Sequence, residues 1–238
     1  MPEPGDKAVP GRQAGRRAPS RDRGEETRQR LIVAAVRLFG ERGFEGTATR
    51  ELAAAAGANL AAIPYHFGGK EALYHAAADH IAGEVASHLA PQLRQVDRVI
   101  EGGRLDPATA RDLLYALVDG FATLVVQPES EEWVRFVLRE QMHPTAAFER
   151  IYSGLIGRIA AVLVRVVATL TGQPADSETV RLRAISVIGQ ILIFRVGRAT
   201  VLRVLDWDEI DADGAAAIRR VLRENVDRLL ALPDAGGA

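Results

Sequence analysis

Apolar residues recur at three- and four-residue spacing along most of this chain, and that spacing constrains the fold more than any other feature. In the first such segment Leu31, Ala35 and Phe39 would share one face of a helix. The Val- and Ile-rich stretches at 159–170 and 185–205 place arginines at helical intervals, and no stretch alternates apolar and polar residues as a half-buried strand does. The sequence therefore predicts an all-α protein.

Composition excludes several classes of protein. The chain contains no cysteine, which rules out a thiol nucleophile, thiolate metal ligands and iron–sulfur clusters. No apolar stretch of signal-peptide length follows the basic N-terminus. The longest apolar run, at 185–194, is ten residues long, whereas crossing a bilayer takes ~20. We therefore expect a cytoplasmic protein with no membrane partner.

The apolar spacing begins only after residue 24. Residues 1–24 hold four prolines, four glycines and six basic side chains, so we expect a disordered Arg-rich arm that is either simply solvated or contacts DNA. Residues 25–74 contain short helices separated by glycines, as in a small helix-turn-helix domain. Residues 75–238 are long enough for a second, larger helical domain.

The spacing of Ala53 and Gly57 is typical of a helix-turn-helix. The motif needs a small residue where its helices cross and, four residues later, a residue that tolerates a left-handed turn. We expect a first helix over residues 49–56 and a second helix that Asn59 caps and a glycine pair ends.

The start of the second helix is the part of such a motif that reaches base edges. Leu60, Ala61 and Ala62 lie there, and their side chains offer only apolar contact or shape. Ala and Gly also occur four residues apart by chance in an Ala-rich chain. The alternative is therefore a helical interaction module that binds a protein partner or small molecule without reading DNA. Pro64 favours this alternative, because it lacks a backbone N–H and is expected to kink the short helix.

A longer set of residues resembles a known family. Residues 27–73 are similar to the DNA-binding domain of TetR/AcrR-type transcriptional regulators. The positions that carry the similarity are Phe39, Gly43-Phe44, Thr47, Glu51-Leu52-Ala53, Gly57, Ile63, Tyr65-His66-Phe67 and Lys70-Glu71-Ala72-Leu73. Residues 61–70, together with Phe136, Arg139-Glu140-Gln141, Pro144-Thr145 and Phe148, resemble the subgroup with a CerR/CecR-type C-terminal domain.

The resemblance implies a ligand-responsive homodimer whose three-helix head binds a palindromic double-stranded DNA operator. Its larger domain, residues 75–238, would bind a small-molecule effector and a second copy of the chain. The side chains expected at DNA are Thr49, Arg50, Asn59, Leu60, Ala61, Ala62, Tyr65, His66 and Lys70. We expect Lys70 to meet a phosphate and Arg50 to read guanine. Ala48 departs from the family's usual capping Ser or Thr.

Two further sets of residues have candidate roles in the larger domain. Tyr115, Phe121, Trp133, Phe136, Arg139, His143, Phe148 and Tyr152 form either an ordinary core with an exposed polar edge or the wall of an effector cavity. The stretch at 176–205 is too apolar for a solvated helix. We expect Ile188, Ile191, Leu192 and Val196 to pack in a four-helix bundle across a two-fold axis.

Catalytic and metal-binding motifs do not appear in the sequence. No HExxH motif, phosphate-binding glycine loop or nucleophile elbow occurs. His75, His80, His88 and His143 form no pair at the four-residue spacing of helical metal ligands. We expect no enzyme activity, no metal site and no cofactor.

Overall fold

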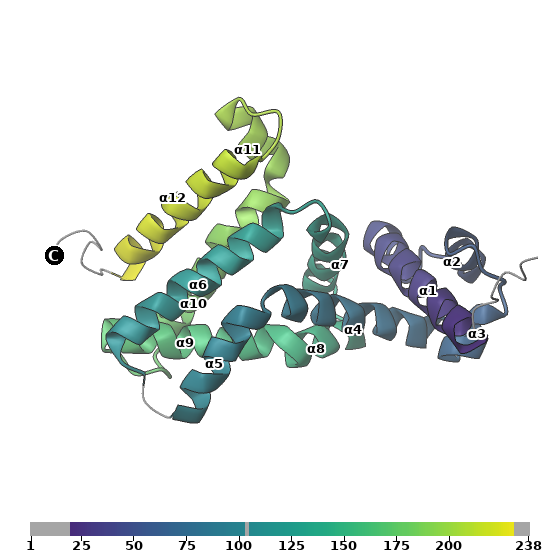
Figure 1. The fold of residues 1–238 in the computed structure, drawn as a ribbon, viewed down its shortest axis with the longest axis horizontal. Helices are drawn as coiled ribbons and strands as arrows, with labels where there is room; N and C mark the ends of the chain where they lie inside the picture. The colour runs from purple at the N-terminus through teal and green to yellow at the C-terminus, as the bar shows by residue number, and fades with distance from the viewer. Residues whose placement is uncertain (1–19, 103–104, 231–238) are drawn as a thin grey trace, which may run out of the picture.

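The computed structural model describes residues 20–102 and 105–230. Every regular element in this part of the chain is helical, as the apolar spacing predicts. Figure 1 shows a small group of N-terminal helices at one end and a larger group that contains the rest. The first helix begins at Ser20, so residues 20–24 are helical and do not belong to a disordered arm. The remainder of the predicted arm lies outside the described residues.

The smaller group, which we call the head, contains four helices. They are α1 (Ser20–Arg42), α2 (Thr49–Ala55), α3 (Ala62–Phe67) and the beginning of α4 (Lys70–His88). Gly43 ends α1, because its φ is +75° and its N–H donates to the carbonyl of Phe39 at 2.8 Å. The core of the head consists of the fully buried side chains Leu31, Phe39, Leu52, Ile63 and Leu73.

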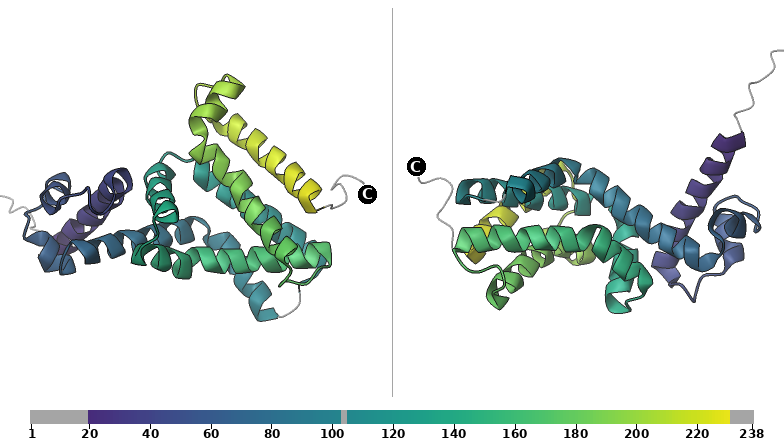
Figure 2. Two further views of the ribbon diagram at one scale, coloured as in Figure 1. Left: turned by 180° about the vertical axis from the view of Figure 1, so that it is seen from behind. Right: turned by 90° about the horizontal axis from the view of Figure 1, so that it is seen from below.

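The larger group, which we call the body, contains the remaining helices. They are α5 (Ala90–Gly102), α6 (Pro107–Val126), α7 (Ser130–Met142), α8 (Ala146–Ile151), the π-helical turn η1 (Tyr152–Ile156), α9 (Gly157–Thr171), α10 (Glu178–Val196), α11 (Arg198–Leu205) and α12 (Ala212–Leu230). Helix α6 packs against α9, α10 and α12. Helix α4 runs from the head into the body, as the two views of Figure 2 show.

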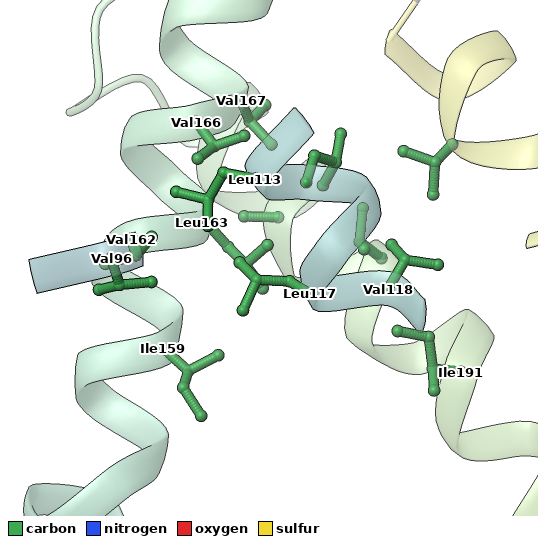
Figure 3. Packing of buried hydrophobic residues seen from close by; sticks show 14 of the residues in the cluster. Val96, Leu113, Leu117, Val118, Ile159, Val162, Leu163, Val166, Val167 and Ile191 are labelled. Atoms are coloured by element: carbon green, nitrogen blue, oxygen red, sulfur yellow. The ribbon is translucent and has the colours of Figure 1, made fainter. Parts of the chain in front are cut away.

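The core of the body forms where α6, α9 and α10 meet. Leu117 and Val118 of α6 converge with Leu163 of α9 and Ile191 of α10 (Figure 3). All four side chains are at least 95% buried. Removing each from water contributes about 1.5–3 kcal/mol, so this packing is a main source of the stability of the body.

The continuous rod of α8, η1 and α9, at residues 146–171, is long and apolar enough to cross a bilayer, and 18 consecutive residues within it have a mean hydropathy of 1.7. Its sequence contains no long uninterrupted apolar run, because Arg158 and Arg165 lie within the rod. It packs against α4, α6 and α10, and Ile159 and Val166 belong to the core of the body. This packing buries 39% of that 18-residue stretch inside the fold.

Candidate DNA-binding head and effector cavity

The turn between α2 and α3 has the geometry that its sequence predicts. Gly57 adopts a left-handed conformation with φ +58°, and Ala58 donates its N–H to the carbonyl of Ala53 at 2.9 Å. Ala53 is 3% exposed, so the small side chain lies where the helices cross. Leu52 and Ile63 are fully buried and hold the two helices together.

The start of α3 differs from the prediction. The helix begins at Ala62 and its N-cap is Ala61, which has no capping side chain. Asn59 instead caps the turn before the helix, where its Oδ1 accepts from the N–H of Ala61 at 2.9 Å. At the start of α2, Ala48 also lacks a capping oxygen, and its N–H donates to the carboxylate of Glu51 at 3.1 Å.

Pro64 does not interrupt α3, contrary to the expected kink. It is the third residue of the helix, within the first turn, where a backbone N–H has no partner inside the helix. The bonds around it are intact: Tyr65 donates its N–H to Ala61, and Gly68 donates to Pro64 itself. Pro64 is therefore compatible with a helix that reads DNA.

All nine residues expected at DNA reach the surface. Tyr65 is 84% exposed and Leu60 is 52% exposed, while Arg50, Asn59 and Ala61 are also exposed. Thr49, Ala62, His66 and Lys70 are half-buried. Packing in the core of the head does not explain why a tyrosine stands at position 65, because most of its ring faces solvent. The head therefore presents polar, apolar and basic groups at its surface, from α2, the turn before α3, α3 itself and the start of α4.

Lys70 begins α4 and is fixed by an aromatic ring. Its Nζ lies 4.3 Å from the ring centroid of Phe44, a cation–π contact. Phe44 in turn packs edge-on against Tyr74, with 5.2 Å between the ring centroids. The ammonium is thus held beside the N-terminus of a long helix, a place that favours a phosphate.

The head is attached to the body by a buried polar network. The hydroxyl of Tyr74 on α4 donates to the carboxylate of Glu140 on α7, which is 1% exposed. The other carboxylate oxygen accepts from the N–H and the hydroxyl of Thr145, at 3.1 and 2.8 Å. Burial, together with the Glu140 carboxylate, raises the pKa of Tyr74 well above its usual value.

A second set of contacts joins α7 to the end of α1. Arg139 donates to the carbonyls of Gly40 and Glu41, at 3.4 and 3.0 Å. A Cβ atom at Gly40 would lie 3.3 Å from the backbone nitrogen of Phe136, so the absence of a side chain lets the two helices approach closely. Phe136 and Arg139 therefore belong to the junction between head and body, not to the predicted effector site.

An apolar cavity of about 250 Å³ lies inside the body. Its wall is formed by Ile81, Ala82, Val85, Leu117, Val118, Phe121, Leu124, Val125, Ser130, Trp133, Val134, Val137, Leu138, Gln141, Ile151, Leu155, Ile156, Ile159, Leu163, Val187, Ile188, Ile191 and Leu192. These side chains come from α4, α6, α7, α8, η1, α9 and α10. The cavity meets the general description of a small-molecule site, mostly apolar with a few polar groups.

Only Phe121 and Trp133 of the predicted effector residues line this cavity. The hydroxyl of Tyr115 instead donates to Asp227 on α12 at 2.7 Å. Phe148 and Tyr152 stack on each other outside the cavity wall, with 5.8 Å between the ring centroids. His143 lies in an outer groove between head and body.

The predicted dimer residues of α10 divide between two faces. Ile188, Ile191 and Leu192 line the cavity of their own protomer, and their place at a subunit interface stays a prediction. Val196 is 53% exposed. It shares the outer face of α10 with three other exposed apolar side chains, Leu182, Ile185 and Ile193. We call these four residues the α10 stripe.

Two family models match the chain, one for each part of the fold. The N-terminal model, for bacterial regulatory proteins of the tetR family, covers residues 31–77. The second model describes the C-terminal domain of the HTH-type transcriptional dual regulator CecR and covers residues 110–232. CecR of Shigella flexneri is 34% identical over 208 residues, which are 87% of this chain and 93% of CecR.

Solved structures have the same fold. The complex of AibR with isovaleryl coenzyme A and operator DNA aligns with a TM-score of 0.58 at 19% identity, over 84% of this chain and 97% of AibR. A transcriptional regulator from Pseudomonas aeruginosa PAO1 also aligns with a TM-score of 0.58, at 22% identity, over 87% of this chain and 91% of that one. This chain belongs to the TetR family of bacterial transcriptional regulators, and its body is the C-terminal domain found in CecR.

Proposed function

We propose that this protein is a homodimeric repressor that leaves a two-fold symmetric operator when a small molecule fills the cavity of its body. The observation that carries the proposal is the double role of α7. One face lines the cavity with Trp133, Val137 and Gln141, and another holds the end of α1 through Phe136 and Arg139. A ligand that displaces α7 therefore acts on the head directly.

Helix α4 supports the same coupling. Ile81, Ala82 and Val85 of its second half line the cavity, while Lys70 and Tyr74 of its first half belong to the head. In a dimer the two heads must fit successive major grooves, about 34 Å apart. A small change in their separation weakens the fit. Tenfold weaker operator binding requires only about 1.4 kcal/mol of difference in ligand affinity between the two states.

The α10 stripe is the surface that we assign to the second copy. Leu182, Ile185, Ile193 and Val196 are each more than half exposed, and together they run along one side of the helix. Exposed apolar side chains that are contiguous on one helix mark an interaction surface. A two-fold axis beside α10 would bury the stripe of each protomer against the other.

A protein of the same fold binds both kinds of partner that we propose, a small molecule and operator DNA. AibR was crystallised with both a small molecule and operator DNA, and we extend that combination to this chain. CecR is named a dual regulator, and in our proposal an operator placed elsewhere relative to the promoter would give activation instead of repression. We place the protein in the cytoplasm, beside its DNA, and we assign it no catalytic activity and no cofactor.

Selection of bound duplexes from a random library tests the proposal, followed by titration of the selected duplex at several salt concentrations. We expect a two-fold symmetric motif with steep salt dependence, because phosphate contacts release counterions. A library of small molecules then reports which compound releases the duplex. Equal affinity for every duplex, or no binding at low salt, would favour the alternative of an interaction module that does not read DNA sequence.

A further inference from the structure

We propose that the effector of this protein is an uncharged, predominantly apolar molecule that directs one polar group toward α7. The inference rests on the proposed function, since it names the class of ligand that the cavity takes. Among the described residues, no Asp, Glu, Lys, Arg or His lines the cavity. An ion placed there would lose its water without gaining a counter-charge, which strongly disfavours binding.

The two charged side chains that are buried in the helices forming the cavity, Glu140 and Arg195, already have partners. Arg195 follows Ile191 and Leu192 on α10 and is 8% exposed, but its guanidinium donates to the carbonyls of Val125 and Gln127. Glu140 precedes the lining residue Gln141, but its carboxylate accepts from Tyr74 and Thr145. Neither charged side chain is among the residues that line the cavity. An acyl coenzyme A, with its several phosphates, therefore fits this cavity poorly.

The polar side chains of the cavity all belong to one helix. Ser130, Trp133 and Gln141 lie on α7, and the other lining residues are apolar. The hydroxyl of Ser130 is oriented by the carbonyl of Gln127, to which it donates at 2.8 Å. Its lone pairs therefore remain to accept a hydrogen bond. A ligand with a hydroxyl or N–H group has its polar partners on the helix that also holds α1.

Two naphthalene dyes that differ mainly in one charge test the inference. N-phenyl-1-naphthylamine is uncharged, and 1-anilinonaphthalene-8-sulfonate has the same ring framework with a sulfonate. In the variant Trp207→Phe the only remaining tryptophan is Trp133, in the cavity wall. We expect the uncharged dye to bind one site per protomer and to quench Trp133, and the sulfonate to bind at least tenfold more weakly.

Cavity-filling variants locate the site. Ala82→Phe and Val134→Phe each add a ring at the wall and should abolish binding of the uncharged dye, while Ala161→Phe, at an exposed position of α9, should leave it unchanged. Urea unfolding identifies any variant that is misfolded. Because Ala82 lies on α4 and Val134 on α7, one substitution remains a test if the other prevents folding. Equal or tighter binding of the sulfonate, or binding of the uncharged dye that survives both fillings, would overturn the inference.

Operator affinity is measured separately, so that the two proposals are distinguishable. If the uncharged dye binds the cavity selectively and leaves operator affinity unchanged, the selectivity of the cavity stands and the release mechanism loses support. If the sulfonate binds preferentially in the cavity and releases the operator, the release mechanism stands and the inferred ligand class is wrong.

Discussion

The hydroxyl of Tyr74 on α4 donates a hydrogen bond to the buried carboxylate of Glu140 on α7. Both helices that it joins contribute to the core of the head and to the cavity wall. The same carboxylate holds the loop between α7 and α8 through Thr145. The pair therefore fixes the orientation of the head at the point where a ligand in the body would act on it.

A double-mutant cycle measures this pair. Glu140→Ala leaves the buried hydroxyl of Tyr74 without an acceptor, at a cost of about 1–3 kcal/mol, and Tyr74→Phe removes the donor. We expect the two changes to be strongly non-additive, with a coupling of about 1.5–3 kcal/mol, as for hydrogen bonds to charged groups. The measurement is the free energy of unfolding in urea, and additive single effects would mean that the bond contributes nothing.

Alkaline pH should destabilise the body through Tyr115. Burial and the hydrogen bond to Asp227 raise the pKa of Tyr115 to about 12. The unfolded chain releases this proton near its ordinary pKa of ~10, so rising pH favours unfolding between about 10 and 12. The contribution of the raised Tyr115 pKa to the free energy of unfolding is fully present below pH ~10. Unfolding of the wild type and of Tyr115→Phe should therefore differ by a constant amount up to that pH and by less above it, and a difference that grows above it would contradict this assignment.

Lys70→Ala should weaken binding to all DNA sequences alike. A phosphate contact carries no sequence information, and its loss lowers the slope of log Kd against log salt by about one. Arg50→Ala is the matched variant, because Arg50 is exposed at the start of α2 and is expected to read a base. Its loss should relax base preference at one position of each half-site. An unchanged salt slope in Lys70→Ala would remove Lys70 from the interface.

The head was predictable from sequence because its determinants are local. Gly43 and Gly57 lie within a few residues of the turns they form, and their left-handed conformations follow from residue type. The cavity was not predictable in the same way, since its wall joins residues from Ile81 to Leu192. Helix α10 is apolar on two faces, so its spacing alone does not say which one turns inward. The sequence therefore did not reveal that Ile188 lines the cavity.

Ile185→Glu should dissociate the dimer. Ile185 is 62% exposed in the α10 stripe, and a carboxylate there would be buried opposite its own copy across the two-fold axis. Sedimentation equilibrium should show a dimer for the wild type and a monomer for the variant, with weaker operator binding because the two heads act independently. Val33→Glu, at an exposed apolar position of α1, is the control and should remain dimeric. A dimeric Ile185→Glu would move the interface away from α10.

Arg139→Met should uncouple the cavity from the head. The change keeps an apolar stem of similar length and removes the hydrogen bonds to the carbonyls of Gly40 and Glu41, which join α7 to the end of α1. Arg94→Met is the control, because Arg94 is exposed on α5, in the body, whereas Arg135 of α7 itself pairs with Glu41 of α1. We expect both variants to bind N-phenyl-1-naphthylamine as the wild type does. The fold-change in operator Kd that this dye causes should shrink in Arg139→Met alone, because movement of α7 would no longer be transmitted through these bonds. If the wild type responds to the dye and Arg139→Met responds equally, the coupling runs through α4 and the pair of Tyr74 and Glu140 instead.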